Sequence, residues 1–115
     1  MLMNQILDTA LIAAKIAAMN DEKARILVNG ASVVYNAAMW SRLEILAVEY
    51  AQVCNIIDFQ ARIRGAYTQE EFNLLHSCRR QIMECNEAIS KYKVMTFIDG
   101  VTLLVDSFSR LNQRT

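Results

Sequence analysis

Apolar residues recur along most of this chain at intervals of three and four, the spacing that gathers side chains on one side of an α-helix. The clearest example is a stripe formed by Val33, Ala37, Trp40, Leu43, Ala47, Tyr50, Cys54, Ile57 and Ala61. A second apolar line in the same segment consists of Ile45, Val48, Ile56, Phe59 and Ile63. Polar residues are left with a thin remaining face, so the segment predicts a long helix that is apolar on two sides.

The rest of the chain predicts helices of other kinds. Residues 2–19 are apolar nearly all round, with Asp8 and Lys15 on one narrow line, and they predict a helix that packs on several sides. Residues 68–93 predict an amphipathic surface helix whose stripe consists of Leu75, Cys78, Ile82, Cys85, Ile89 and Tyr92. A last helix is predicted from about Thr96, and its apolar residues are Phe97, Val101, Leu104, Phe108 and Leu111.

Residues that stop and start helices mark two of the boundaries. Gly65 suits the position after a helix C-terminus, and Thr68 with Glu71 forms a capping box that opens the next helix. Asn20 is expected to cap the helix that follows it. The pair at residues 29–30, Asn-Gly, either ends a short helix or kinks a longer one, and both alternatives stay open.

Composition supports an all-α fold with few connections. The chain has no proline and only three glycines, whereas folds with many tight turns need both. Thr96 and Asp99 offer a further cap, and Gly100 lowers the helix propensity beside it. We therefore expect a single domain over residues 1–115, built as an antiparallel bundle of about four helices with one or two of them unusually long.

The long helix leads us to expect self-association. A helix over residues 31–64 is about 51 Å long at roughly 1.5 Å per residue, whereas a compact chain of this length is about 35 Å across. The hydrophobic fraction is 54%, above the roughly 45–50% of ordinary soluble domains. A second copy that covers the excess apolar surface makes a homodimer the expected state, and a bent monomeric four-helix bundle is the alternative.

Other properties narrow the setting. The longest apolar run, residues 9–20, is interrupted by Lys15, and no stretch approaches the roughly 20 residues of a membrane span. The N-terminus lacks the early basic residues of a secretory signal, so we expect a cytoplasmic protein without membrane contact. Twelve basic and twelve acidic residues cancel, which removes the long-range field that favours nucleic acid. Cys54, Cys78 and Cys85 are expected to be reduced core thiols.

No residue pattern indicates an enzyme, a metal or a cofactor. His76 is the single histidine, and its spacing from Cys78 and Cys85 does not suit zinc. The chain also lacks the Glu-x-x-His motif of di-iron bundles and a glycine-rich phosphate loop. No base is apparent that would activate Cys54 as a nucleophile. We expect no enzyme activity, with a small enzyme of unrecognised site as an alternative.

The function that these observations favour is a protein–protein interaction module, such as an adaptor, an inhibitor or an immunity-type protein. Its partners are expected to be a second copy and an unidentified protein. The residues predicted to bind a partner are Met39, Trp40, Leu46, Tyr50 and Val53. The alternative is a nucleic-acid-associated regulator whose basic bundle end is formed by Arg62, Arg64, Arg79 and Arg80. Glu70 and Glu71, in the first turn of the helix that would approach DNA, argue against that alternative.

Overall fold

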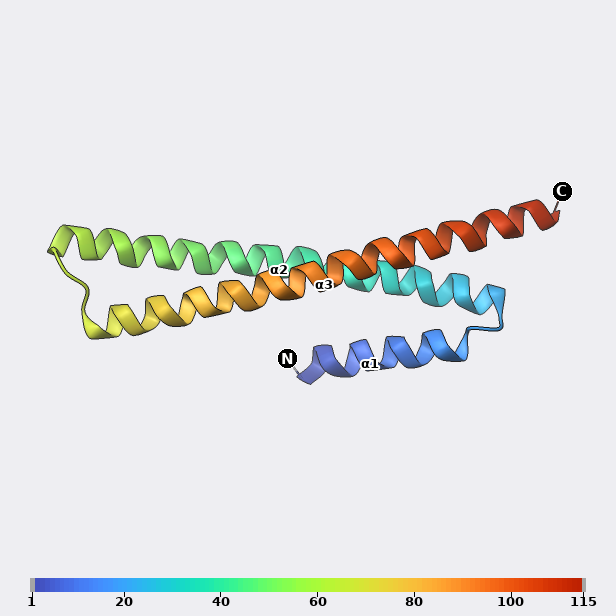
Figure 1. The fold of residues 1–115 in the computed structure, drawn as a ribbon, viewed down its shortest axis with the longest axis horizontal. Coiled ribbons are helices and arrows are strands. Elements are labelled where there is room, and N and C mark those ends of the chain that lie inside the picture. Colours follow the sequence, from blue (N-terminus) through green and yellow to red (C-terminus); the bar gives the residue numbers. More distant parts are fainter. Residues whose placement is uncertain (1, 115) are drawn as a thin grey trace. The chain divides into compact units, whose positions relative to one another are not determined.

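The computed structural model describes residues 2–114, with side chains from Gln5 to Asn112. Three helices account for nearly all of them: α1 (Leu2–Ala17), α2 (Glu22–Arg64) and α3 (Gln69–Arg114) (Figure 1). No strand occurs within these residues. The all-α prediction and the unusually long helices are confirmed. The expected number of about four helices is corrected to three over the described range.

The separate fourth helix predicted from about Thr96 is absent from the described residues, because α3 continues without a break past Thr96 and Asp99. The carboxylate of Asp99 accepts hydrogen bonds from side chains of α1 and α2 instead of from the backbone of its own helix. Gly30 and Gly100 both have helical backbone, since the only glycine with positive φ among the described residues is Gly65. The pair at residues 29–30 therefore neither ends nor interrupts α2.

The turn between α2 and α3 follows the sequence closely. Gly65 has a φ of 91°, and its N–H donates to the carbonyl of Ala61 at 2.8 Å, as expected for a glycine that ends a helix. The Thr68 hydroxyl accepts from the Glu71 N–H at 3.1 Å, and the Glu71 carboxylate accepts from the Thr68 N–H at 2.9 Å. The predicted capping box is confirmed.

The start of α2 differs from expectation by one residue. Asp21, rather than Asn20, accepts a hydrogen bond from the N–H of Ala24 at 3.3 Å. The carbonyl of Asp21 also accepts the N–H of Arg25 at 2.8 Å, so α2 begins at Glu22. Either side chain is chemically suited to cap a helix, and the backbone path of the short connection after α1 decides which one does.

The chain packs as two compact units. Unit 2 comprises Ala38–Tyr92 and is an α-hairpin formed by the later part of α2 and the earlier part of α3. The residues at its centre are Cys54, Ile57, Leu75 and Cys78, with Tyr50 and Ile82 packed against them. The inner apolar stripes predicted for both helices are therefore confirmed in this unit.

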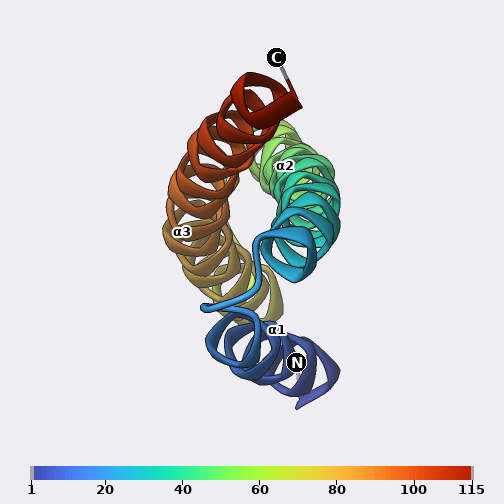
Figure 2. The same cartoon turned by 90° about the vertical axis from the view of Figure 1, so that its right-hand side faces the viewer.

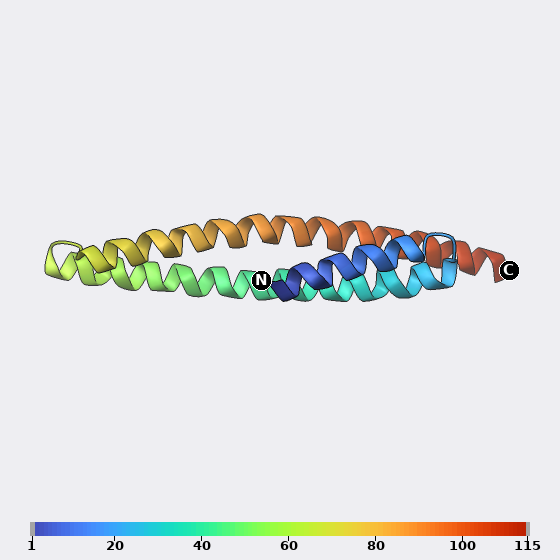
Figure 3. The same ribbon diagram turned by 90° about the horizontal axis from the view of Figure 1, so that it is seen from below.

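Unit 1 comprises the residues up to Ala37 and those from Lys93 onwards. It contains α1, the first part of α2 and the last part of α3, and α1 lies beside the other two segments (Figures 2 and 3). Its buried side chains are mostly polar, namely Asn29, Ser32, Asn36 and Asp99, together with Ala18. The most deeply buried side chains of the unit are thus polar, which is unusual, while Leu11, Val33 and Leu103 are half-buried. The prediction of a single domain stays a prediction.

Candidate functional site

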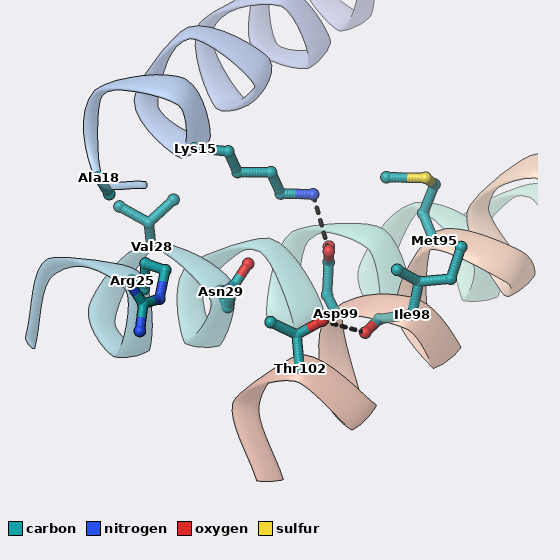
Figure 4. Close-up of a pocket in the computed structure, with 9 residues that line it drawn as sticks. All are labelled: Lys15, Ala18, Arg25, Val28, Asn29, Met95, Ile98, Asp99 and Thr102. Atoms are coloured by element: carbon teal, nitrogen blue, oxygen red, sulfur yellow. Dashed lines mark hydrogen bonds and ion pairs between the residues drawn. The ribbon is translucent and has the colours of Figure 1, made fainter. Parts of the chain in front are cut away.

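A buried polar network occupies the middle of unit 1. Asp99 on α3 is only 3% exposed, and its Oδ1 accepts a hydrogen bond from the Nζ of Lys15 on α1 at 2.7 Å (Figure 4). Its Oδ2 accepts from the Ser32 hydroxyl and from the Asn36 Nδ2, the latter at 3.1 Å. Asn36 also donates to the Ser32 oxygen at 3.1 Å. One carboxylate therefore connects all three helices of the unit.

Further polar contacts flank this network. The guanidinium of Arg25 donates to both carboxylate oxygens of Asp106 at 3.3 Å, and it donates to the carbonyl of Met19 at 2.7 Å. The hydrogen bond with Asp106 raises the pKa of Arg25. On the other side, the Tyr35 hydroxyl donates to Asp8 at 2.9 Å. The charged residues of α1 are therefore directed toward α2 and α3.

A pocket of about 240 Å³ lies against the network. Its lining consists of Lys15, Ala18, Arg25, Val28, Asn29, Met95, Ile98, Asp99 and Thr102 (Figure 4). This volume is below the roughly 300–1,000 Å³ of typical small-molecule sites. Lys15, Arg25 and Asp99 already satisfy one another or nearby side chains, so the arrangement is suited to fixing α1 in place. Among the described residues, no group of three or more potential metal ligands is found.

The outward side of unit 1 is apolar. On α3, the exposed residues Val94, Phe97, Val101, Leu104, Phe108 and Leu111 form what we call the α3 stripe, and they retain 45–72% of their surface. Leu27 and Val34 on α2 are 74% and 70% exposed. Ile6, Ile12 and Ile16 on α1 are exposed as well. Each of the three helices thus carries large hydrophobic side chains on its outer side.

Unit 2 has an apolar outer line of its own. It consists of Ile45, Val48, Ile56, Phe59 and Ile63, which are 57–73% exposed. These residues are the second apolar line of the sequence analysis, and no part of the described chain covers them. They lie on the side of α2 opposite the inner stripe that packs in the hairpin core. Packing within the hairpin therefore explains the inner stripe but not the outer line.

The residues predicted to bind a partner are mostly not the exposed ones. Met39 is buried in unit 2, whereas Trp40, Leu46 and Tyr50 are half-buried and Val53 is 36% exposed. The indole N–H of Trp40 donates to Glu44 at 2.8 Å on the surface. Partner binding by these five residues stays a prediction. The outer lines described above expose considerably more apolar surface.

The four arginines proposed as a basic end are all exposed, and acidic groups lie among them. Arg64 pairs with Glu71 through its two terminal guanidinium nitrogens, Nη1 and Nη2, and the contact from Nη2 is 2.7 Å. The Tyr67 hydroxyl donates to Asp58 at 2.6 Å, and this bond is the main reason why the pKa of Tyr67 is raised. Arg62 and Arg79 act on the same hydroxyl in the opposite direction. The positive charge at this end is therefore partly balanced.

The three cysteines are free and buried in the structure, as expected for core thiols. Burial raises the pKa of Cys54, and the neighbouring thiol of Cys78 adds to the effect. Burial likewise raises the pKa of Cys85. His76 lies on the exposed surface of α3.

Comparison of the chain with known protein families, with curated proteins and with solved structures finds no match. Within residues 2–114, no helix has a stretch long and apolar enough to cross a membrane.

The polar network was not among the predictions from sequence, although the spacing of its residues contains a signal for it. Arg25, Asn29, Ser32 and Asn36 follow one another at intervals of four, three and four. Asp8 and Lys15 are seven residues apart, as are Asp99 and Asp106. Polar residues at helical spacing within apolar segments indicate a polar side of the helix. They do not show by themselves which side faces inward.

Proposed function

We propose that this chain is a protein–protein interaction module that acts through the apolar outer faces of its helices, with a second copy among its partners. The observation that carries the proposal is the arrangement of unit 1, in which Lys15 pairs with Asp99 and Arg25 with Asp106 inside the unit, while all three helices expose large hydrophobic residues. Water is a poor environment for contiguous apolar surface, and such patches beyond a few hundred Å² mark interaction sites.

The outer line of unit 2 supports the same function. Because its side chains contribute little to the hairpin core, the stability of a single chain does not account for five large hydrophobic residues at helical spacing. Association accounts for them, since it removes them from water.

The proposal is tested by measuring molar mass with light scattering over a micromolar concentration series. We expect a mass above the 13.1 kDa of one chain. In parallel, immobilised chain is used to capture proteins from its native host. A matched variant carries Lys at the exposed positions Ile45 and Phe97, and we expect it to lose captured partners. A monomeric mass at every concentration, combined with identical capture by both chains, contradicts the proposal.

A further inference from the structure

The α3 stripe has the regularity of a coiled-coil seam. Its six residues from Val94 to Leu111 follow one another at intervals of three, four, three, four and three, which are the a and d positions of a heptad. Ile98 and Val105 occupy the flanking e positions and are 48% and 62% exposed. All eight belong to unit 1 and to one continuous helix.

The charges of this segment are placed away from the seam. Between residues 94 and 111 the charged residues are Asp99, Asp106 and Arg110. Asp99 and Asp106 form ion pairs with Lys15 and Arg25 on the inner side of the unit. The a, d, e and g positions over this range therefore carry no charge. Such a face does not repel a copy of itself, and it offers nothing that would select a charged partner.

The exposed area matches what a stable dimer requires. The exposed fractions of the eight residues range from 45% to 72%. Applied to whole-residue areas of roughly 160–210 Å², these fractions amount to about 800 Å² per chain. A specific interface buries about 800 Å² on each partner. A second copy of the same helix thus suffices to cover the stripe.

We propose that the α3 stripe binds the α3 stripe of a second copy in an antiparallel arrangement around a twofold axis near residues 102–103. Val94, Phe97 and Val101 then face Leu111, Phe108 and Leu104 of the second copy. Each Val meets a larger Leu, so these layers have similar widths, whereas a parallel pair sets Val against Val and Leu against Leu. The parallel pair also brings Lys93 close to its own copy. This inference rests on the proposed function and specifies one interface for it.

The first test compares two exposed residues of similar accessibility. Leu104 on the stripe is 59% exposed and Phe59 on the outer line of unit 2 is 64% exposed. Because a twofold interface contains each substitution twice, Leu104→Lys is expected to weaken dimerisation at least about 100-fold. Phe59→Lys is expected to leave the dimer intact. Sedimentation equilibrium measures the dimer dissociation constants of the wild type and both variants. Circular dichroism verifies that both variants stay helical.

The second test reports the orientation. Val94→Cys and Leu111→Cys chains are prepared separately and then mixed under mild oxidation. An antiparallel pair yields a disulfide in the mixture and none in either chain alone, because residue 94 lies about 25 Å along the axis from its own copy. The chain with only its three buried native thiols is the control. Cross-linking of Val94→Cys with itself shows a parallel pair and overturns the proposal.

The outcomes separate this inference from the proposed function. If Phe59→Lys dissociates the assembly and Leu104→Lys does not, the α3 interface is wrong while the interaction module stands. If the chain is monomeric at every concentration, the proposed homodimer is wrong. If the wild type and the variant with Lys at Ile45 and Phe97 also capture the same proteins, the interaction module is contradicted as well. A monomer that co-sediments with phosphatidylglycerol vesicles, and loses this binding with Leu104→Lys, shows that the stripe contacts lipid and overturns the inference.

Discussion

Substitution of Asp99 tests whether the polar network of unit 1 holds its three helices together. Asp99 is 3% exposed, and the side chain of its ion-pair partner Lys15 is 24% exposed. Asp99→Asn leaves the ammonium group of Lys15 without its counter-charge and weakens the bonds from Ser32 and Asn36. Lys15→Met leaves the carboxylate buried with two neutral donors. The first substitution disturbs three contacts and the second disturbs one.

The magnitude follows from the burial of these groups. Removal of one partner from a buried ion pair costs about 3–5 kcal/mol, and the partial exposure of Lys15 lowers this range. We therefore expect each single substitution to cost about 2–4 kcal/mol. The double variant Lys15→Met with Asp99→Asn should cost less than the sum, with a coupling energy of about 1–3 kcal/mol. A domain of ordinary stability has about 5–15 kcal/mol, so the effect is readily measured.

The assay is urea unfolding followed by circular dichroism at a fixed chain concentration, because association makes apparent stability depend on concentration. Hydrogen exchange locates the effect, and we expect the amides of α1 to exchange faster in Asp99→Asn. The control is Glu44→Gln at the exposed pair with Trp40, which should change stability by less than about 0.5 kcal/mol. Strictly additive single substitutions, or an Asp99→Asn chain as stable as the wild type, refute the reasoning.

Three other predictions concern single features of the fold. Gly30→Ala and Gly100→Ala should each stabilise the chain by about 0.5–1 kcal/mol in urea unfolding, since an added Cβ meets no atom within 4 Å, whereas Gly65→Ala at φ 91° should destabilise it. Thr68→Ala should cost about 1 kcal/mol. The hydrogen bond from the Thr68 N–H lowers the pKa of Glu71. The charged Glu71 therefore stabilises the folded chain at pH above the usual carboxyl pKa, and this stability is lost as pH falls through the lowered pKa. Glu71→Gln should make the stability less dependent on pH in this acid range. The raised pKa values of Cys54 and Cys85 should slow the reaction of these thiols with Ellman's reagent in the folded chain. The melting temperature should fall as pH rises through the raised pKa values. Rapid labelling of the native chain contradicts the first expectation.

The sequence predicted the local structure of unit 2 well because each signal there acts over a few residues. Gly65 and the pair of Thr68 with Glu71 fix the turn through their own backbone contacts. The inner stripe of Leu43, Cys54 and Ile57 follows from spacing alone. The number of helices was wrong because Asp99 has two chemically reasonable uses, as a cap in its own helix or as an acceptor for Lys15. Only the packing of distant segments distinguishes them.

The direction in which the helices of unit 1 face was also beyond the sequence. Phe97 and Leu104 form a regular apolar stripe, and such a stripe ordinarily packs inside its own domain. Here the polar positions of the same helix are matched by polar residues of α1 and α2, so Asp99 and Asp106 face inward. When a helix has both a regular apolar face and a regular polar face, the helices packed against it determine which face is buried. The local spacing of residues does not specify this choice.

A polar interior in unit 1 is compatible with the proposed interaction module. Buried ion pairs add little net stability, since desolvation offsets most of the Coulomb attraction. They do require particular partners at particular positions, and Lys15 with Asp99 therefore fixes the register of α1 against α3. Many large apolar residues of the unit stay exposed, where the proposed association would bury them. Unit 1 thus combines specific polar contacts inside with apolar surface outside. If the α3 stripe pairs as proposed, Asp99→Asn should weaken dimerisation less than Leu104→Lys does, although it destabilises the folded unit more.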